Sequence, residues 1–346
     1  MLIGSYSIPS PWASAPSAHG AGIVAASLDA RTGMRDQRPA RFEANPSFLA
    51  LDEGGGHVWA ITEPEHGGEL LRFALAADGG LFEEEPIRIE TGADAPCHVA
   101  LGPGVALVSH YHGGVVSVVV RDVLGAPDRV AQLISPPAAG EGWDRRDAVS
   151  RPHAAMFLPG GEAFVVADCG RDLVALYGWD REAGRAELRQ AVVLEPGTGP
   201  RHLAWHDASR TILVSNQDLG GVTALGATGV ELRVRQVLPG AGIGRNRTVP
   251  SEIAVHPDGT RVVLANRGDD SLTVYGIDGG GMLTELSSFD CGGRNPRHFA
   301  FSPDGAMLAV AQQDSDRLTV FRWDGARPVD PAPFAVATPT AVLFVP

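Results

Sequence analysis

One segment recurs along the whole chain, and this repeat limits the possible fold more than any other feature. Each copy begins at a proline, continues as a short apolar strand, turns at PDG, PGG, EGG or GPG, and returns through a run rich in Val, Ile, Leu and Ala. Successive marker prolines lie 43 to 56 residues apart, at Pro46, Pro96, Pro152, Pro200, Pro250, Pro296 and Pro339. Each copy predicts a β-hairpin, except the last, TPTAVLFVP, which is a single strand.

The segments between these hairpins supply two more strands per repeat. Alternating stretches such as ELLRFAL, DLVALYGWD and SLTVYGID are followed by a turn and a polar strand such as MLTELSSFD. Four-stranded units that repeat every forty to fifty residues or so are typical of β-propellers, whose blades bury their faces against each other. The predicted fold is therefore all-β: a seven-bladed β-propeller with four-stranded antiparallel blades.

The two ends of the chain complement each other. The N-terminal residues MLIGSY resemble a second strand, and GIVAASLD and MRDQRPARFE follow as the third and fourth. The C-terminal TPTAVLFVP supplies the missing first strand. We therefore expect residues 1–346 to form one domain whose last blade is closed by the N- and C-terminal strands.

Composition narrows the classes of partner. A net charge of -13 disfavours a nucleic-acid partner, because phosphate backbones select basic surfaces. Cys97, Cys169 and Cys291 form neither a disulfide framework nor a CxxC pair, which indicates reduced structural thiols. The N-terminus has no basic region and no stretch is long and apolar enough for a membrane span. We expect a cytoplasmic protein, monomeric or weakly homo-oligomeric, without a membrane partner, metal or cofactor.

Candidate site residues follow from the repeat, because the first strand of each propeller blade lines the central channel. Residues after the marker prolines, and those ending the second strands, should meet at one mouth. The polar residues at these positions include Glu63, His98, His153, Arg201, His202, Gln217, Glu252, Arg267, Arg297 and His298. Arginine and histidine gathered in an acidic protein predict a locally positive funnel for a carboxylate or phosphate.

A structural role is the alternative for these residues. The repeated Pro-Arg-His can form a scaffold in which the side chains bond carbonyls of the next blade, and this role is favoured for His202 and His298. His110 and His112 in SHYHGG could bind a metal only with a third ligand, which the sequence does not place nearby.

The motifs NPSFLAL, PCHVAL with SHYHGG, RPHAAMFLPGG with VVADCGRD, PGTGPRHLAWH, PSEIAVHPDG with LANRGDD, and NPRHFAFSPDG resemble the seven-bladed lactonase family. That family includes bacterial 6-phosphogluconolactonases of the propeller type and fungal carboxy-muconate lactonizing enzymes. The resemblance covers essentially the whole chain.

This resemblance implies an active mouth that contains a histidine, two arginines and a glutamate. By motif, these match His153 in RPHAA, Arg201 in GPRH, Arg267 in ANRG and, in place of the glutamate, Gln217. A glutamine hydrogen-bonds but cannot accept a proton as a general base. Asp218 could replace the acid only if the strand bends locally, because successive strand residues point to opposite faces.

The function implied is hydrolysis of a small anionic sugar lactone, such as 6-phosphogluconolactone. His153 would act as the base, Arg201 and Arg267 would bind the anion or the developing oxyanion, and Gln217 would orient the ring or the water. Contacts with the substrate are expected from Glu63, His98, His202, Glu252 and Arg297. Two alternatives remain: a cycloisomerase of the carboxy-muconate type, and a propeller that binds a ligand without turnover.

Overall fold

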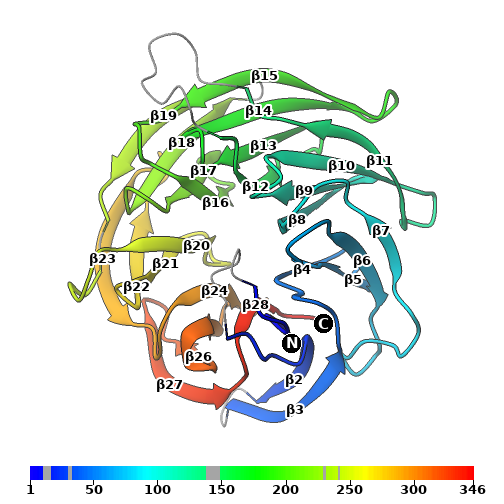
Figure 1. Ribbon diagram of the computed structural model, residues 1–346. Helices are drawn as coiled ribbons and strands as arrows, with labels where there is room; N and C mark the ends of the chain where they lie inside the picture. The colour runs from blue at the N-terminus through cyan, green and yellow to red at the C-terminus, as the bar shows by residue number, and fades with distance from the viewer. Residues whose placement is uncertain (11–16, 30–32, 138–148, 229–230, 241) are drawn as a thin grey trace.

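A computed structural model describes residues 1–10, 17–29, 33–137, 149–228, 231–240 and 242–346. Within these residues the strands form seven four-stranded antiparallel sheets around a central axis (Figure 1). The predicted seven-bladed β-propeller is confirmed.

Six blades use four consecutive strands each. They are β4 (Phe48–Leu51), β5 (His57–Ile61), β6 (Glu69–Ala74) and β7 (Ile87–Glu90); β8 (Pro96–Gly102), β9 (Val105–His110), β10 (Val115–Arg121) and β11 (Pro127–Ile134); β12 (Pro152–Phe157), β13 (Ala163–Asp168), β14 (Leu173–Asp180) and β15 (Arg185–Val193); β16 (Pro200–His206), β17 (Thr211–Asn216), β18 (Val222–Thr228) and β19 (Glu231–Leu238); β20 (Val249–Val255), β21 (Arg261–Arg267), β22 (Ser271–Ile277) and β23 (Leu283–Asp290); and β24 (Pro296–Phe301), β25 (Met307–Gln312), β26 (Arg317–Trp323) and β27 (Pro328–Ala335). A short 3-10 turn, η1 (Gln313–Ser315), follows β25.

The seventh blade is built from both ends of the chain, as predicted. Its strand order is β28 (Pro339–Leu343), β1 (Leu2–Ser5), β2 (Ile23–Asp29) and β3 (Gly33–Arg41). The register pairs Leu2 with Leu343 and Ile3 with Val342. The ring is thus closed by backbone hydrogen bonds between the terminal strands.

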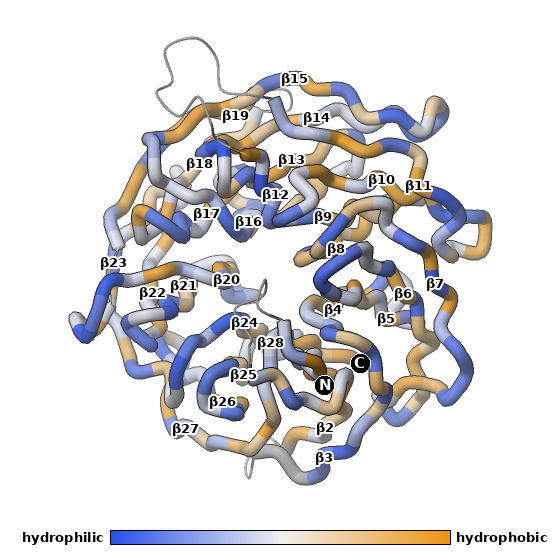
Figure 2. The backbone as a smooth tube through the Cα atoms, in the orientation of Figure 1, coloured by the Kyte–Doolittle hydropathy of each residue, from blue (hydrophilic) through white to orange (hydrophobic). Residues whose placement is uncertain are grey.

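Apolar side chains pack between neighbouring blades. Phe164 and Tyr177 stack with ring centroids 5.2 Å apart, and they share a cluster with Val105 and Leu107 of the preceding blade. Every residue of β9, β13 and β17 is buried, because these second strands are covered on both faces by adjacent blades. The fourth strands lie outside, where hydrophilic positions are common along β7 and β23 (Figure 2).

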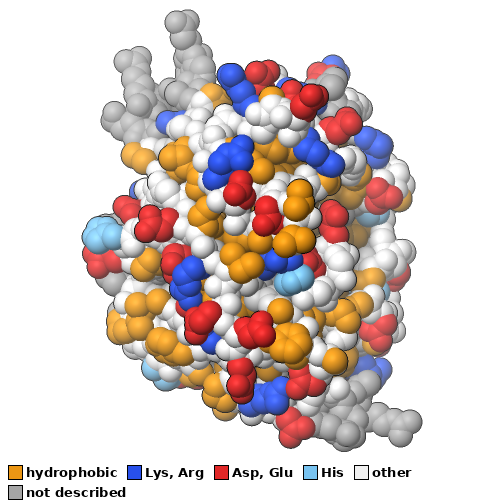
Figure 3. Space-filling view, turned by 90° about the vertical axis from the view of Figure 1, so that its right-hand side faces the viewer, with side chains coloured by type: hydrophobic (Ala, Val, Ile, Leu, Met, Phe, Trp, Pro, Cys, Tyr) orange, Lys and Arg blue, Asp and Glu red, His pale blue; other side chains and the backbone are white. Residues whose placement is uncertain are grey.

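Arginine and acidic side chains are interspersed over the face drawn in Figure 3. Within the described residues, no helix has the length and apolar character required to cross a bilayer. The cytoplasmic location and the oligomeric state stay predictions.

The terminal strand pair should carry much of the stability of the ring. Ending the chain at Thr338 removes β28 and exposes the edge of β1, together with the apolar face that Ala341 and Val342 cover at 1% and 2% exposure. We expect a large fall in melting temperature or aggregation, measured by circular dichroism and light scattering. Removal of the exposed Pro346 alone should leave the melting temperature unchanged, and an equally stable chain without β28 would contradict closure by this strand.

Candidate functional site

The first strands of five blades bulge directly after their marker proline. The register with the second strand shifts between Pro96 and His98, Pro152 and Ala154, Pro200 and Leu203, Pro250 and Ile253, and Pro296 and His298. A bulge adds a residue and redirects the side chains around it, so simple alternation does not hold here. Successive residues such as Arg201 and His202 are therefore both buried near the axis, at 2% and 4% exposure.

Five side chains, each two residues after a marker proline, converge on the axis and form what we call the inner ring: Phe48, His98, His202, Glu252 and His298. Phe48 lies at the centre of the contacts, with its ring centroid 4.3 Å from His98, 5.9 Å from His202 and 5.4 Å from His298. Equivalent positions in different blades thus meet, as the repeat predicts.

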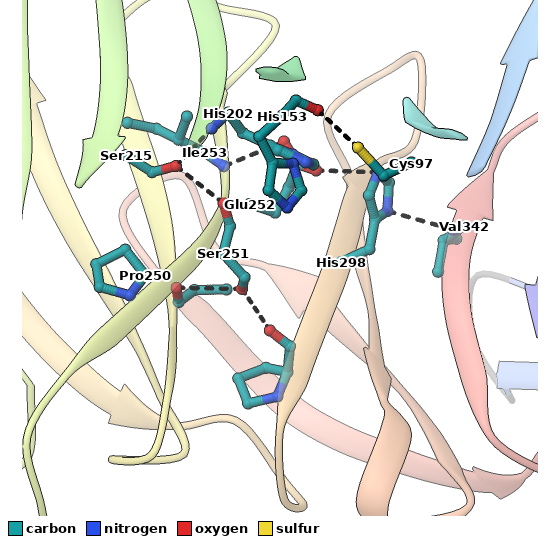
Figure 4. Close-up of polar contacts among 12 residues, drawn as sticks. Cys97, His153, His202, Ser215, Pro250, Ser251, Glu252, Ile253, His298 and Val342 are labelled. Carbon is teal, nitrogen blue, oxygen red and sulfur yellow. Dashed lines mark hydrogen bonds and ion pairs between the residues drawn. The ribbon is translucent and has the colours of Figure 1, made fainter. Parts of the chain in front are cut away.

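Glu252 joins two of these histidines, as Figure 4 shows. Its Oε2 accepts a hydrogen bond from His202 Nδ1 at 2.8 Å and lies 3.1 Å from His298 Nε2. The backbone N–H of Val342 donates to His298 Nδ1 at 3.2 Å, so the proton of this imidazole is on Nε2, facing the carboxylate. In the structural alternative, His202 and His298 bond carbonyls of the next blade; in the structure, both contact a carboxylate.

Contacts between an imidazole and a carbonyl of the next blade occur at the opposite end of the first strands, at histidines that the sequence analysis did not single out. His206 Nε2 lies 3.0 Å from the carbonyl oxygen of Gly259, and His256 Nε2 lies 3.1 Å from that of Gly305. Histidines at the two ends of the first strands therefore have different partners.

The imidazoles near the axis are neutral at physiological pH. Burial lowers the pKa of His98 to about 3 and the pKa of His298 to about 4. Burial and the charge of Arg201 place the pKa values of His153 and His202 well below the usual 6.5. These imidazoles are therefore available as proton acceptors.

Three guanidinium groups, Arg201, Arg267 and Arg297, lie beside the inner ring, and we call them the arginine cluster. Burial and the charge of Arg297 lower the pKa of Arg201 to about 10, and burial with Arg201 and Arg297 lowers the pKa of Arg267 well below its ordinary value. Arg201 Nε and Nη1 and Arg267 Nε are buried without a hydrogen-bond partner among the described residues. Buried donors of one charge, left unpaired, indicate a binding site for an anion.

Arg297 has a protein partner that the sequence analysis missed. Its Nη2 donates to the Tyr6 hydroxyl at 2.5 Å, and this hydroxyl donates to Glu63 Oε2 at 2.9 Å. The guanidinium also lies 5.0 Å from the centre of the Tyr6 ring. Tyr6 directly follows β1, the second strand of the closing blade, so the rule that selected Glu63 after β5 could have found it.

Gln217 lies beside Arg267, in the turn that follows β17. Its Oε1 accepts from Arg267 Nη2 at 2.7 Å, and its Nε2 lies 3.7 Å from Cys169 Sγ and 3.4 Å from Asp218 Oδ1. Because β17 ends at Asn216, strand alternation does not separate Gln217 from Asp218. A Cβ at Gly199, where φ is +59°, would come within 2.6 Å of the Asp218 carboxylate, so only glycine leaves room for it.

His153 lies between the arginine cluster and the inner ring. Its ring centroid is 5.1 Å from His202 and 5.4 Å from Tyr111, and its Nδ1 is buried without a partner among the described residues. Tyr111, also missed from sequence, is covered by the Arg151 guanidinium at 5.4 Å.

The possible histidine metal pair is not assembled. His110 is buried, with its Nδ1 3.2 Å from the Asp94 carbonyl oxygen and its Nε2 3.0 Å from Ser117 Oγ. In the part of the chain that the structure describes, no three His, Cys, Asp or Glu side chains are grouped to hold a metal ion.

Neutral burial of histidine should make stability depend on pH. The pKa of His98 is about 3 and those of His110 and His298 are about 4, against an unfolded value near 6.5. The unfolded chain therefore binds more protons between these values, so the stabilisation is complete above pH 6.5 and is lost as the pH falls toward 4. Each such histidine should cost about 2 kcal/mol of unfolding free energy at pH 5, measured by urea titration.

His98→Phe tests this dependence, because phenylalanine keeps an aromatic ring but binds no proton. The variant should lose less stability between pH 7 and pH 5 than the wild type, whereas His66→Gln, at a side chain 81% exposed, should follow the wild type. Equal slopes for all three proteins would contradict the neutral burial of His98.

Comparison with known proteins shows which family this chain belongs to. The model of the family described as "Lactonase, 7-bladed beta-propeller" matches residues 1–344. The chain is 26% identical over 286 residues to the 6-phosphogluconolactonase of Bacillus subtilis, covering 80% of each protein, and 23% identical over 266 residues to that of Formosa agariphila, covering 74% of each. The solved periplasmic gluconolactonase of Pseudomonas aeruginosa superposes with a TM-score of 0.87 and 26% identity, over 100% of this chain and 98% of the other. The family model spans nearly the entire chain, and this protein therefore belongs to the seven-bladed β-propeller lactonases.

Proposed function

We propose that this protein hydrolyses a sugar lactone that carries an anionic group, of the 6-phosphogluconolactone class. The observation that carries the proposal is the arginine cluster, whose buried and unpaired N–H groups lie next to a neutral histidine. Family membership and the names of the relatives support the same reaction class. An anion would supply the hydrogen-bond acceptors that Arg201 and Arg267 lack.

In the proposed reaction, His153 accepts a proton from water while the water oxygen attacks the lactone carbonyl carbon. The carbonyl oxygen becomes an oxyanion, which a guanidinium of the cluster stabilises. The bond between the carbonyl carbon and the ring oxygen then breaks, and the proton returns from His153 to that oxygen. The product is a hydroxy acid, and no other reactant is required.

Gln217 takes the place where the family carries a glutamate, and it acts here through hydrogen bonds. Its Oε1 accepts from Arg267 Nη2 at 2.7 Å, and its amide, which donates to Cys169 Sγ and Asp218 Oδ1 through long contacts in the free protein, would donate to the substrate. Burial and the charges of the arginine cluster lower the pKa of His153, and no carboxylate of the described residues hydrogen-bonds its Nδ1. A bound anion that offsets the arginine charges would therefore favour protonation of this imidazole.

The first test is hydrolysis of 6-phosphogluconolactone, measured against its spontaneous rate. The wild type should accelerate it, and His153→Gln should lower kcat by about 10²–10⁴-fold, as expected for loss of a general base. The variant should keep its fold, because His153 Nδ1 has no hydrogen-bond partner among the described residues that the substitution would remove.

Three results would contradict this proposal in different ways. A fully active His153→Gln would remove the assignment of the base. Binding of 6-phosphogluconate without any lactone turnover would favour a ligand-binding propeller, and formation of a lactone from a muconate would favour the cycloisomerase.

The second test concerns the arginine cluster. Arg201 is 2% exposed and lies near the charge of Arg297, so Arg201→Gln should raise the stability of the free protein while weakening anion binding. Inorganic phosphate should raise the melting temperature of the wild type, by the equivalent of about 2.7 kcal/mol at a hundred times its dissociation constant. The variant should show a much smaller rise.

Arg185→Gln provides the matched control, because its side chain is 69% exposed on β15. This variant should respond to phosphate as the wild type does. An unchanged phosphate response in Arg201→Gln would place the anion site elsewhere.

A further inference from the structure

A buried carboxylate, an imidazole of fixed tautomer and a second imidazole lie in series beside the arginine cluster. Glu252 Oε2 is 2.8 Å from His202 Nδ1, and the His202 ring centroid is 5.1 Å from that of His153 at an interplanar angle of 64°. The three side chains come from β20, β16 and β12 and are 8%, 4% and 7% exposed. The mechanism above uses only His153.

The tautomer of His202 follows from its partner. Because a carboxylate only accepts hydrogen bonds, the proton of the neutral imidazole is on Nδ1, and Nε2 carries a lone pair. His202 Nε2 is buried and has no hydrogen-bond partner among the described residues. This nitrogen can satisfy its hydrogen-bonding capacity only by accepting from a donor near the site.

His153 is the neighbouring imidazole that can supply this donor, and the two nitrogens are not hydrogen-bonded to each other in the free protein. Its Nδ1 is likewise buried and without a partner among the described residues, and its ring is in edge contact with His202. If Nδ1 carries the proton of the neutral imidazole, Nε2 is the basic atom that remains for water. Hydrogen bonds of catalytic groups are often long in the empty enzyme and shorten in the substrate complex.

We propose that Glu252, His202 and His153 form a proton relay, in which His202 is a positioning residue that accepts the Nδ1 proton of His153. This inference rests on the proposed lactone hydrolysis. It assigns a role to His202 and Glu252 beyond the substrate contact expected from sequence.

The relay balances in protons and charge. As water attacks, one O–H proton moves to His153 Nε2, and the proton on His153 Nδ1 moves to His202 Nε2. Positive charge then lies on His202, whose Nδ1–H remains hydrogen-bonded to the Glu252 carboxylate. When the ring oxygen leaves, both transfers reverse and the alkoxide receives a proton from His153.

The Glu252 carboxylate offsets part of the cost of placing this charge on His202. The charged and titratable groups facing His202 include Arg201, Arg267, Arg297, His98, His153, Glu252 and His298, which shares the Glu252 carboxylate. An imidazolium at His153 would lie among the three arginines, and no carboxylate of the described residues hydrogen-bonds its Nδ1. At His202 the same charge contacts a carboxylate at 2.8 Å, which opposes the arginine repulsion.

The experiment compares wild type, His153→Gln, His202→Gln and Glu252→Gln by lactone hydrolysis in mixtures of light and heavy water. If two protons move in the transition state, a plot of wild-type kcat against the deuterium fraction of the solvent is curved. If only one proton moves, the plot is a straight line. His202→Gln should keep the wild-type KM, lower kcat by about tenfold or more within the range of general-base effects, and give a straight line. Glu252→Gln should do the same, because an amide allows His202 to adopt the wrong tautomer.

His206→Gln is the matched control. His206 lies on the same strand β16, is equally buried at 4% exposure, and has its Nδ1 2.6 Å from Ser209 Oγ. It lies at the other end of the strand, so the variant should keep the wild-type kcat and the curved dependence. If it loses activity as His202→Gln does, the effect reflects packing and the relay is wrong.

The remaining outcomes separate the relay from the proposed function. The relay would be overturned if His153→Gln lost activity while His202→Gln kept full activity and a curved plot of kcat against deuterium fraction. That result would leave the proposed lactone hydrolysis intact. Without any wild-type turnover, both proposals fall. His98 Nδ1 is also buried without a partner among the described residues, and the ring centroid of His98 is 5.5 Å from that of His202. A straight plot for His98→Gln together with a curved plot for His202→Gln would overturn the assignment of His202 as the positioning residue.

Discussion

Hydrogen bonding between β1 and β28 closes the ring, and the candidate site depends on this closure directly. The strand pair does more than join the ends, because each strand contributes a contact at the axis. Tyr6, which follows β1, holds Arg297 and Glu63 through its hydroxyl, and Val342 of β28 fixes the tautomer of His298 through its backbone N–H. An open ring would lose these contacts along with the apolar packing of the blade.

The candidate site contains a cluster of positive charges, although the whole molecule is negatively charged. The chain carries a net charge of -13, yet three guanidinium groups are close enough to depress the pKa values of Arg201 and Arg267. Such an arrangement is unfavourable in the empty protein and favourable once an anion is bound. In the proposed function, the cluster would select for negative charge at some cost in the stability of the free protein, a common relation between binding and folding.

The β-bulges after the marker prolines allow a first strand to bury two neighbouring side chains near the axis, where a regular strand would place one. Regular strands would send alternate residues to opposite faces, so each first strand could place one of two neighbours at the axis. The bulge in β16 instead buries Arg201 for the anion and His202 for Glu252. One strand thereby serves both the arginine cluster and the inner ring.

Sequence by itself determined the number of blades, their four strands, the closure by the two ends, and the positions that meet at one mouth. These follow from a proline-marked repeat and from strand periodicity, which are local properties that recur in order along the chain. The pairing of Glu252 with His202, the role of Tyr6 and the proximity of Gln217 to Arg267 were decided only by tertiary structure. Those contacts join residues about fifty or more positions apart, and they depend on bulges and on the angles between blades. No local pattern specifies such angles, because they result from the packing of all seven blades around the axis at once.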